Sequence, residues 1–401
     1  MTNYNHILHK ATTMLLTAAA ALSLCLLTGC NREDLPETGK YNVSVQLDTK
    51  TIDPSEVGSI VIYAFADTDG SGNEKLVGYL KETVSDTDTD GIFNMTLWSR
   101  GEDGYVDFYV LLNYDSRGFK ICDTNGVEVD FDFDAQTYSP QDIQNWTVRR
   151  TPGNVPSDVS AWKVPMSNLE KTQPTGGSPE SNRRFYLEDI KGWQVIPIEV
   201  TRAVSKVEVW FWSNDHLTGG NQPYYYYSIT SQTITDPIAE TANIFSNDAH
   251  NSAGTAATTI TNTKRYDAYN SEGRTNVGLS NGEYFPQYVE NTYFYSSDYF
   301  KLIWEQYILP NTLFGGNELG QGSTGCTELL VNYEYYKQER SRFQWIWPTP
   351  SKRSTPVYLP KSPRNTKVVV WCGLGKDVDP SFNYLVVEWD ETVTIEVPEF
   401  D

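Results

Sequence analysis

Short segments in which apolar and polar residues alternate run through most of the chain, and they predict β-strands. From Tyr41 to Leu47 every second residue is apolar, so these side chains share one face of a half-buried strand. Ser59–Phe65 is apolar almost throughout, which is typical of a central strand. The turn-forming cluster Asp67–Asn73 then predicts a hairpin with the strand Leu76–Leu80.

The same pattern continues to the end of the chain, with turn residues between the strands. Short strands separated by turns are typical of a β-sandwich, so the predicted fold class is all-β. Further strands are expected at Phe93–Leu97, Tyr105–Leu112, Ile196–Val200, Val207–Phe211, Glu328–Tyr336, Lys367–Cys372, Tyr384–Trp389 and Thr392–Val397.

Three segments depart from the alternation. Residues 151–182 are rich in proline and glycine and predict a long irregular connection, with a short extended piece at Val164–Ser167. Residues 229–282 are dominated by small and polar residues and predict a long surface excursion. Between Ser297 and Pro310, helical spacing of apolar residues predicts one short helix, from Tyr299, Leu302, Ile303 and Tyr307.

The N-terminal residues have the pattern of a bacterial lipoprotein precursor. Met1–Lys10 is a short polar region with one lysine, and an apolar core from Leu15 leads into Leu27-Thr28-Gly29-Cys30, which matches a lipobox. We therefore predict a signal peptide over residues 1–29 and lipid attachment at Cys30. The apolar run is shorter than the roughly 20 residues of a transmembrane helix. Acyl chains on Cys30 would instead anchor the protein, at about 0.8 kcal/mol per buried CH2.

The residues after Cys30 refine the expected location and the domain limits. Asn31-Arg32-Glu33-Asp34 resembles a signal that sends some lipoproteins to the outside of the outer membrane, so surface exposure is expected. The 372 residues left after cleavage suggest two domains. We predict a tether over residues 30–40, an N-terminal domain over residues 41–195 and a C-terminal domain over residues 196–401.

Charge excludes one class of partner. Without residues 1–29 the chain has 30 basic and 52 acidic side chains, a net charge of −22. This field repels nucleic acid and anionic membrane surfaces, so no nucleic-acid partner is expected. The 26 tyrosines, 16 phenylalanines and 11 tryptophans favour strands over helices.

Three cysteines follow Cys30 in the chain: Cys122, Cys326 and Cys372. Two interpretations stay open. Either Cys326 and Cys372, which fall in one predicted domain, form a disulfide and Cys122 is a buried thiol, or all three are small buried thiols. No Cys-x-x-Cys motif is present, so neither a zinc site nor a redox site is predicted.

Motifs for catalysis are absent from the sequence. His216 and His250 are the only histidines after residue 30, and both lie in polar, loop-like sequence. Neither Gly-x-Ser-x-Gly nor His-Glu-x-x-His occurs, and there is no P-loop or dinucleotide fingerprint. We therefore expect neither an enzyme nor a bound cofactor.

Asp86, Asp88 and Asp90 form a weak candidate for a metal site. With the following glycine they match the first half of a calcium loop, which places oxygens at alternate positions before a sharp turn. Leu97 stands where such a loop needs a bidentate glutamate, so a solvated acidic turn is favoured. The segment Asp67–Gly72 is interpreted in the same way.

Two aromatic clusters keep a second function open. Tyr224–Tyr227 and Phe343–Trp347 could stack on sugar rings, so a surface glycan-binding lipoprotein is the alternative hypothesis. Because neighbouring residues of a strand point to opposite faces, half of each cluster is expected in the core.

Several local motifs, in a fixed order, resemble those of a known family. Val164-Pro165-Met166-Ser167 is followed by Val200–Val207, with the sequence Val-Thr-Arg-Ala-Val-Ser-Lys-Val, and Pro363-Arg364-Asn365-Thr366 precedes a strand. The closing strands Tyr384–Trp389 and Val393–Val397 complete the series behind the lipobox. Together these motifs resemble the fimbrillins, the two-domain subunits of type V pili.

The resemblance implies two tandem transthyretin-like Greek-key β-sandwich domains and a fimbrial function. Members of the family polymerise by strand exchange: a protease removes an early strand, and the opened groove accepts a strand from a neighbouring subunit. Stalk subunits are cut after an arginine that follows the first strand, whereas this chain has no arginine between Arg32 and Arg100. We therefore expect an anchor or other terminal subunit that retains Tyr41–Leu47. Its expected partners are other fimbrial subunits and the outer membrane, with surface glycans or proteins as further candidates.

Overall fold

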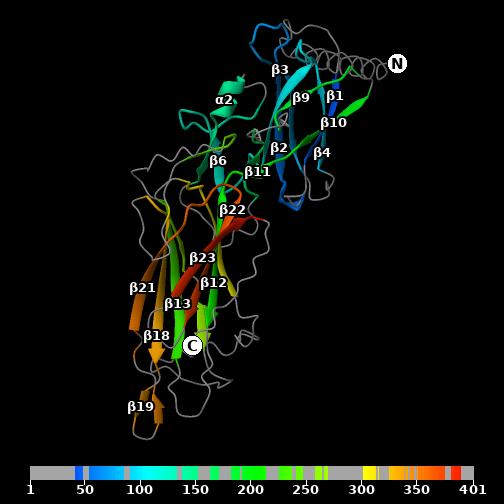
Figure 1. The fold of residues 1–401 in the computed structure, drawn as a ribbon. Coiled ribbons are helices and arrows are strands. Elements are labelled where there is room, and N and C mark those ends of the chain that lie inside the picture. Colours follow the sequence, from blue (N-terminus) through cyan, green and yellow to red (C-terminus); the bar gives the residue numbers. More distant parts are fainter. Residues whose placement is uncertain are drawn as a thin grey trace, which may run out of the picture.

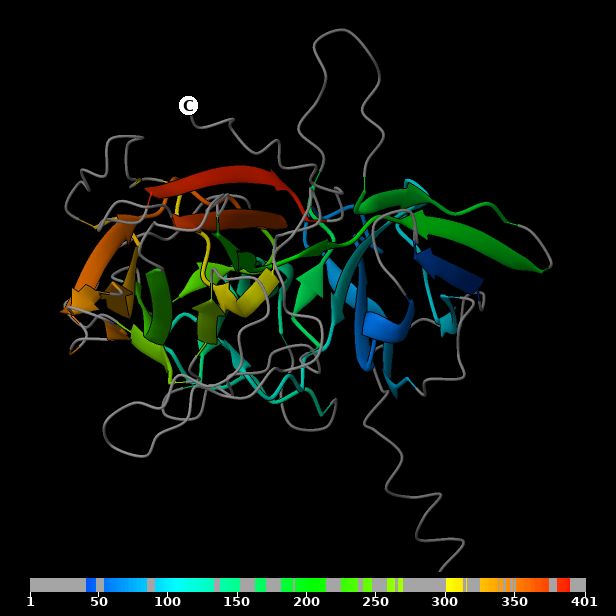
Figure 2. The ribbon, with the colours of Figure 1, turned by 90° about the horizontal axis from the view of Figure 1, so that it is seen from below.

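The computed structural model contains two β-rich lobes, one built mainly from the first half of the chain and one from the second (Figures 1 and 2). Apart from the short helix α2 and one 3-10 turn, the regular structure of the described residues is β-strand, which confirms the all-β prediction. No helix in the described part of the chain has the length and apolar character of a membrane span. The structure describes residues 41–47, 54–84, 91–132, 138–151, 163–170, 182–189, 192–213, 225–236, 241–246, 258–263, 266–269, 301–312, 315, 325–337, 339–341, 344–346, 349, 351–374 and 381–389.

The first lobe is a sandwich of two sheets. The smaller sheet has the order β10-β1-β4, and the larger has the order β11-β8-β5-β2-β3 with β9 beside β5. The strands are β1 Tyr41–Leu47, β2 Ser59–Ala66, β3 Lys75–Thr83, β4 Ile92–Leu97, β5 Tyr105–Leu112, β8 Met166–Ser167, β9 Arg184–Tyr186, β10 Trp193–Ile198 and β11 Thr201–Arg202. The 3-10 turn η1 (Pro54–Glu56) precedes β2.

The central strand and the hairpin predicted from the sequence are both confirmed. All residues of β2 are buried, because β3 and β5 pair with its edges and side chains pack on both faces. In the turn to β3, the Asp67 carboxylate accepts hydrogen bonds from the backbone N–H groups of Ser71 (3.1 Å) and Gly72 (2.7 Å). Asp67 thus stabilises a turn, as expected for aspartate in this position.

A small third layer packs beside the larger sheet. It consists of α2 (Pro140–Gln144) and a sheet of order β14-β7-β6, with β6 Phe119–Cys122, β7 Thr147–Arg150 and β14 Ala242–Asn243. Ser139 and Asp142 form a capping box at the start of α2. The fully buried Trp146 meets Tyr63 of β2 edge-on, with ring centroids 5.7 Å apart, and so joins this layer to the sandwich.

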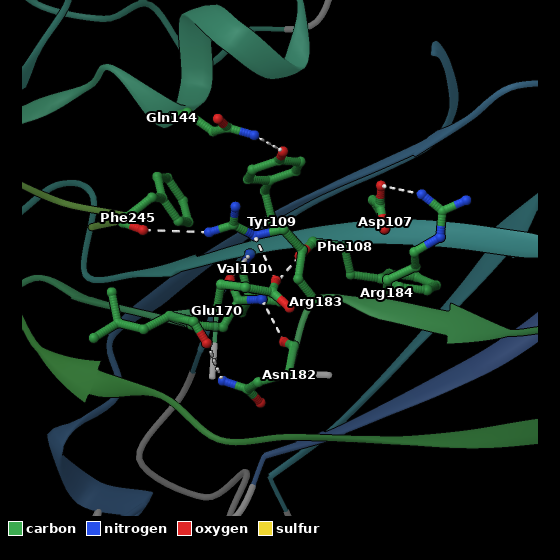
Figure 3. A network of polar contacts seen from close by, with 12 residues as sticks. Asp107, Phe108, Tyr109, Val110, Gln144, Glu170, Asn182, Arg183, Arg184 and Phe245 are labelled. Carbon is green, nitrogen blue, oxygen red and sulfur yellow. Dashed lines mark hydrogen bonds and ion pairs between the residues drawn. The ribbon is translucent and has the colours of Figure 1, made fainter. Parts of the chain in front are cut away.

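Polar contacts strengthen the same interface next to β9 (Figure 3). The Arg183 guanidinium lies 4.6 Å from the centroid of the Tyr109 ring and donates a hydrogen bond to the Phe245 carbonyl at 3.2 Å. Gln144 of α2 donates to the Tyr109 hydroxyl at 2.7 Å. The outer face of β5 is therefore tied to the third layer through Tyr109.

The second lobe is also a sandwich of two sheets. Their orders are β17-β12-β22-β23 and β15-β13-β18-β21, with β16 beside β13, and their buried side chains form a separate hydrophobic cluster. A short hairpin, β19-β20, extends from this lobe. The strands are β12 Ser205–Ser213, β13 Tyr225–Asp236, β15 Thr258–Asn262, β16 Tyr266–Tyr269, β17 Lys301–Ile308, β18 Glu328–Lys337, β19 Glu339–Ser341, β20 Gln344–Ile346, β21 Ser351–Tyr358, β22 Thr366–Leu374 and β23 Ser381–Glu388.

The short helix predicted before Pro310 is wrong, because β17 occupies this segment. β17 pairs antiparallel with β12, and the register shifts between Val209 and Trp210, which leaves Ile303 as the extra residue of a bulge. Ile303 and Trp304 are consequently both buried. The bulge replaces the period of two with a spacing that resembles that of a helix.

The surface excursion predicted for residues 229–282 is also wrong over much of its length, since most of β13 and all of β14, β15 and β16 lie within it. Ile229, Ile234 and Ile260 are buried in the core of the second lobe. Gln232 and Asn262 are buried as well and share a hydrogen bond of 2.8 Å between β13 and β15. Polar residues that share a hydrogen bond in this way can lie in a buried strand.

Two hydrophobic clusters mark the division between the lobes. Apart from five later residues, the first cluster runs to Val204, and the second begins at Val207. Because β10 pairs with β1, a boundary after residue 195 would divide a strand of the first lobe. We propose instead that the boundary lies between Val204 and Ser205, where β12 begins.

Cys122 and Cys326 are buried thiols, so Cys326 does not take part in the disulfide that was one of the two interpretations. Cys372 lies in β22, where the structure describes its backbone.

Candidate functional site

The first strand lies at the centre of the smaller sheet of the first lobe. β1 pairs antiparallel with β4 on one side and parallel with β10 on the other. Both of its edges therefore take part in backbone hydrogen bonding, and the dark-blue β1 lies beside the green β10 in Figure 2. Removal of β1 would leave β4 and β10 with unpaired edges on either side of an open groove.

Alternate side chains of β1 hold the strand on the hydrophobic core, as the sequence pattern predicted. Val43, Val45 and Leu47 are buried, and burial of each such side chain contributes about 1.5–3 kcal/mol. The opposite face is polar, where Ser44 Oγ donates to Asn94 Oδ1 of β4 at 2.6 Å. β1 is thus an integral part of the lobe.

Arg100, the first arginine after β1, is itself engaged in the fold. Its guanidinium lies 5.1 Å from the ring centroid of Tyr41 and donates a hydrogen bond to the Leu187 carbonyl. The side chain thereby connects the beginning of β1 with the segment between β9 and β10. Cleavage after Arg100 would separate β2, β3 and β4 as well as β1 from the rest of the chain.

Three of the motifs quoted for the family resemblance meet where the two lobes join. β8, from the first motif, pairs with β11, from the second. Arg364, from the third, donates hydrogen bonds to the carbonyls of Thr201 (2.9 Å), Arg202 (3.1 Å) and Ile244 (2.9 Å) and to Ser167 Oγ (3.1 Å). Burial lowers the pKa of Arg364 to about 9, so the group stays charged at neutral pH.

A second arginine, the fully buried Arg202, completes the junction. Arg202 donates to both carboxylate oxygens of Glu56 at 2.9 Å and to Asn365 Oδ1 at 3.2 Å. Its guanidinium also lies 4.8 Å from the ring centroid of Trp389, on which Tyr307 stacks at 5.5 Å. Glu56 belongs to the first lobe and the other three partners to the second. These five residues, here termed the junction cluster, bridge the two lobes.

Three of the five residues of the junction cluster lie in the sequence motifs, and two do not. Arg202, Asn365 and Trp389 lie in quoted motifs, but Glu56 lies in a 3-10 turn without a recognisable pattern. Tyr307 lies in the segment where a helix was predicted. Burial raises the pKa of Tyr307 to about 12, so its ring is neutral and suited to stacking on Trp389.

Other predicted site residues fall where the structure describes no side chain. The backbones of Tyr225–Tyr227 and Trp345 form parts of β13 and β20. Lipid attachment at Cys30 and the calcium hypothesis stay predictions. Outside the described residues lie Cys30, Asp86, Asp88, Asp90, His216, Tyr224, His250, Phe343, Trp347 and the strand expected at Thr392–Val397.

No family model matches the chain, and no curated protein matches it. Among solved structures, the chain is similar to fimbrial proteins.

Three of these similar structures come from Porphyromonas gingivalis and Bacteroides vulgatus. The tip fimbrial protein Mfa3 from Porphyromonas gingivalis, with a C-terminal truncation, is 12% identical with a TM-score of 0.42, over 87% of this chain and 99% of that one. A fimbrial protein from Bacteroides vulgatus gives the same four values. The fimbrilin FimA from Porphyromonas gingivalis is 11% identical with a TM-score of 0.43, over 87% of this chain and 97% of that one.

Proposed function

We propose that this chain is a lipid-anchored fimbrial subunit of the cell surface, which keeps its first strand and occupies an anchor or terminal position in a type V pilus. The position of β1 in the smaller sheet is the main observation behind the proposal. The strand fills the space between β4 and β10, in a stretch of sequence that has no arginine between Arg32 and Arg100.

A subunit that accepts a strand from a neighbour must first lose the strand that fills its own groove. Because β1 is paired on both edges and buries three apolar side chains, its release requires cleavage of the chain. An arginine-specific protease finds no site between β1 and Arg100, and the Arg100 side chain is engaged with Tyr41. A retained β1 also keeps the predicted lipid at Cys30 covalently joined to the first lobe.

The proposed partners follow from this arrangement. The subunit joins other fimbrial subunits by β-strand complementation, in which backbone hydrogen bonds supply affinity and side-chain pockets supply register. It joins the outer membrane through the lipid on Cys30. With its own groove filled, it marks the end of a chain of subunits, and the junction cluster keeps its two lobes connected.

Substitution of the predicted lipid site tests the anchor. Cys30→Ala should release the protein, and any fimbria it holds, from the cells into the medium. Cys25→Ala is the matched control, because residue 25 lies in the predicted signal peptide and its loss should leave the protein on the cells. Retention of the Cys30→Ala protein on the cell surface would exclude lipid anchoring at this residue.

A second experiment tests strand retention separately. Intact-mass analysis of the surface protein should give a chain that begins at residue 30, whereas a chain that begins beyond residue 50 would refute the proposal. Lys50→Arg places an arginine after β1, and an arginine-specific protease should then cut the variant there. Lys50→Gln is the control and should remain whole.

A further inference from the structure

A pair of exposed tyrosines lies on the larger sheet of the first lobe, in strands that belong neither to the β1 sheet nor to the junction cluster. Tyr105 of β5 and Tyr186 of β9 are directly opposite each other, with ring centroids 5.4 Å apart and ring planes at 70°. They are 40% and 52% exposed, while Tyr109, further along the same face of β5, is buried beneath the third layer. The two rings and Arg184 of β9 are here termed the tyrosine platform.

The backbone beneath the tyrosine platform holds one ring in place. Gly104 has φ +84°, and a Cβ at this position would collide with the ring of Tyr186. The Tyr186 ring therefore lies against the backbone of Gly104, while about half of the residue stays exposed. Leu187 donates its backbone N–H to the Gly104 carbonyl at 2.8 Å, which fixes the loop and the strand relative to each other.

Charged groups surround the rings. The Arg184 guanidinium lies 5.2 Å from the ring centroid of Tyr105 and forms ion pairs with Asp103 (2.9 Å), Asp107 (3.7 Å) and Glu74 (4.0 Å). Figure 3 shows Arg184 and Asp107 facing each other beside β5. Asp107 Oδ1 is buried and has no hydrogen-bond partner among the described residues. The rim thus presents both hydrogen-bond donors and acceptors around the two exposed rings.

From this geometry we propose that the tyrosine platform binds a neutral pyranose sugar. The C–H face of a pyranose ring is apolar and flat enough to stack on an accessible tyrosine face. Its hydroxyl groups both donate and accept, which matches carboxylates and a guanidinium placed at the rim. This site is separate from the aromatic clusters that the sequence suggested, and it does not depend on the anchor function.

Charge selects between classes of sugar. Three carboxylates, from Glu74, Asp103 and Asp107, face a single guanidinium at the rim. The whole chain carries a net charge of −21. Sulfated or carboxylated sugars are therefore repelled, and neutral sugars are favoured. A proline-rich peptide can also stack on tyrosines, but it offers no hydroxyl groups for the charged rim.

Retention on immobilised polymers tests the proposal with the purified full-length chain. Mannan and galactan serve as neutral probes, heparin as the anionic probe and poly-L-proline as the peptide probe. We expect retention on at least one neutral polysaccharide. Tyr186→Ala should weaken it at least tenfold, and Gly104→Ala should weaken it by displacing the ring.

Two variants serve as controls, with equal melting temperatures as the check of folding. Tyr186→Phe keeps the stacking surface and should retain binding. Trp193→Ala removes a ring that is 51% exposed on β10 of the other sheet, and it should have no effect. Failure on both neutral polymers, stronger retention on heparin, binding to poly-L-proline alone, or unchanged binding by Tyr186→Ala would each overturn the proposal.

Discussion

At the scale of single residues, the junction between the lobes contains two arginines that are satisfied in different ways. Arg202 has a carboxylate partner, Glu56, and a ring partner, Trp389. Among the described residues, Arg364 donates its hydrogen bonds only to neutral oxygens, including the carbonyls of Thr201 and Ile244. Loss of Arg364 would leave the buried carbonyls of Arg202 and Ile244 without this donor. Loss of Arg202 would leave the partly buried Glu56 and Asn365 side chains without theirs. Either loss costs more than that of a surface ion pair.

Arg202→Met should lower the free energy of unfolding by about 2–4 kcal/mol, because Glu56 and Asn365 lose their donors and Trp389 loses its cation. Urea denaturation measures the change. Lys75→Met is the control: it breaks the Lys75–Asp69 ion pair, in which both side chains are about half exposed, and should change stability by less than about 1 kcal/mol. Equal effects of the two substitutions would show that Arg202 is not a structural residue.

Asp107 makes stability depend on pH. Burial, followed by a hydrogen bond with Glu74, raises its pKa to about 7 against the positive charges of Arg184 and Arg183. The unfolded value is about 3.9, so between these values the folded chain binds a proton that the unfolded chain does not. Stability from this group is therefore fully present below about pH 4 and is lost as the pH rises through 7.

The side chain introduced by Asp107→Asn does not titrate, so the substitution should remove this loss of stability with rising pH. Between pH 5 and pH 8 the melting temperature of the variant should fall less than that of the unsubstituted chain. Asp103→Asn is the control: a backbone hydrogen bond from Tyr105 lowers the pKa of Asp103, so its titration lies below this range. Parallel pH profiles of Asp107→Asn and the unsubstituted chain would contradict the prediction.

At the scale of strands, alternation in the sequence predicts an element only while the pairing register is constant. β1 keeps its register with β4 and β10 and was predicted from its alternation. β2 was predicted from a continuous apolar run, although its register with β3 shifts between Ala64 and Phe65. β17 contains a bulge opposite β12, and β13 has a register shift between Ile229 and Ser231 opposite β18. In both strands the apolar spacing changes at the irregularity, so the period of two is lost although the strand continues.

Local sequence patterns do not predict which strands pair or which distant residues come into contact. β10 lies about 150 residues after β1 in the chain, yet the two are parallel neighbours. Ser167, Arg202 and Arg364 were noticed only through the family resemblance, and nothing in their spacing predicts that they meet. Tyr105 and Tyr186 likewise fall in separate strands, and only the pairing of β5 with β9 brings them together.

Two substitutions at adjacent positions test whether burial of one face of β1 stabilises the first lobe. Val45→Asp places a carboxylate in the core and should lower stability by about 3 kcal/mol or more. Gln46→Asp places the same group on the exposed face and should change it by less than about 0.5 kcal/mol. Limited proteolysis of the first lobe reports the difference. Equal resistance of both variants would mean that β1 does not support the lobe.

At the scale of the whole molecule, the two lobes do not have independent cores. Five hydrophobic residues from the second half of the chain belong to the cluster of the first lobe: Ala242, Ile244, Phe245, Tyr307 and Leu309. Ala242 lies in β14, which pairs with β7 of the first half. The chain thus returns to the first lobe after entering the second, so the lobes should unfold together.

A fragment that ends at Val204 should therefore be less stable than the full chain. Without Phe245 the rings of Tyr109 and Trp146 lose a covering partner, so the fragment should bind the dye ANS and unfold at a lower urea concentration. The full chain should unfold in one transition. A fragment with the urea midpoint of the first lobe in the full chain would show that the lobes are independent.

The orientation of β1 has a mechanical consequence. The strand begins at Tyr41, where the polypeptide arrives from residue 30, and β10 runs beside it in the same direction towards β11 and the arginine-lined contact between the lobes. Tension applied at residue 30 would act along the axis of β1, so the ladders on both edges would be sheared and their bonds strained simultaneously. A strand loaded in this geometry resists force far better than one that is peeled off bond by bond.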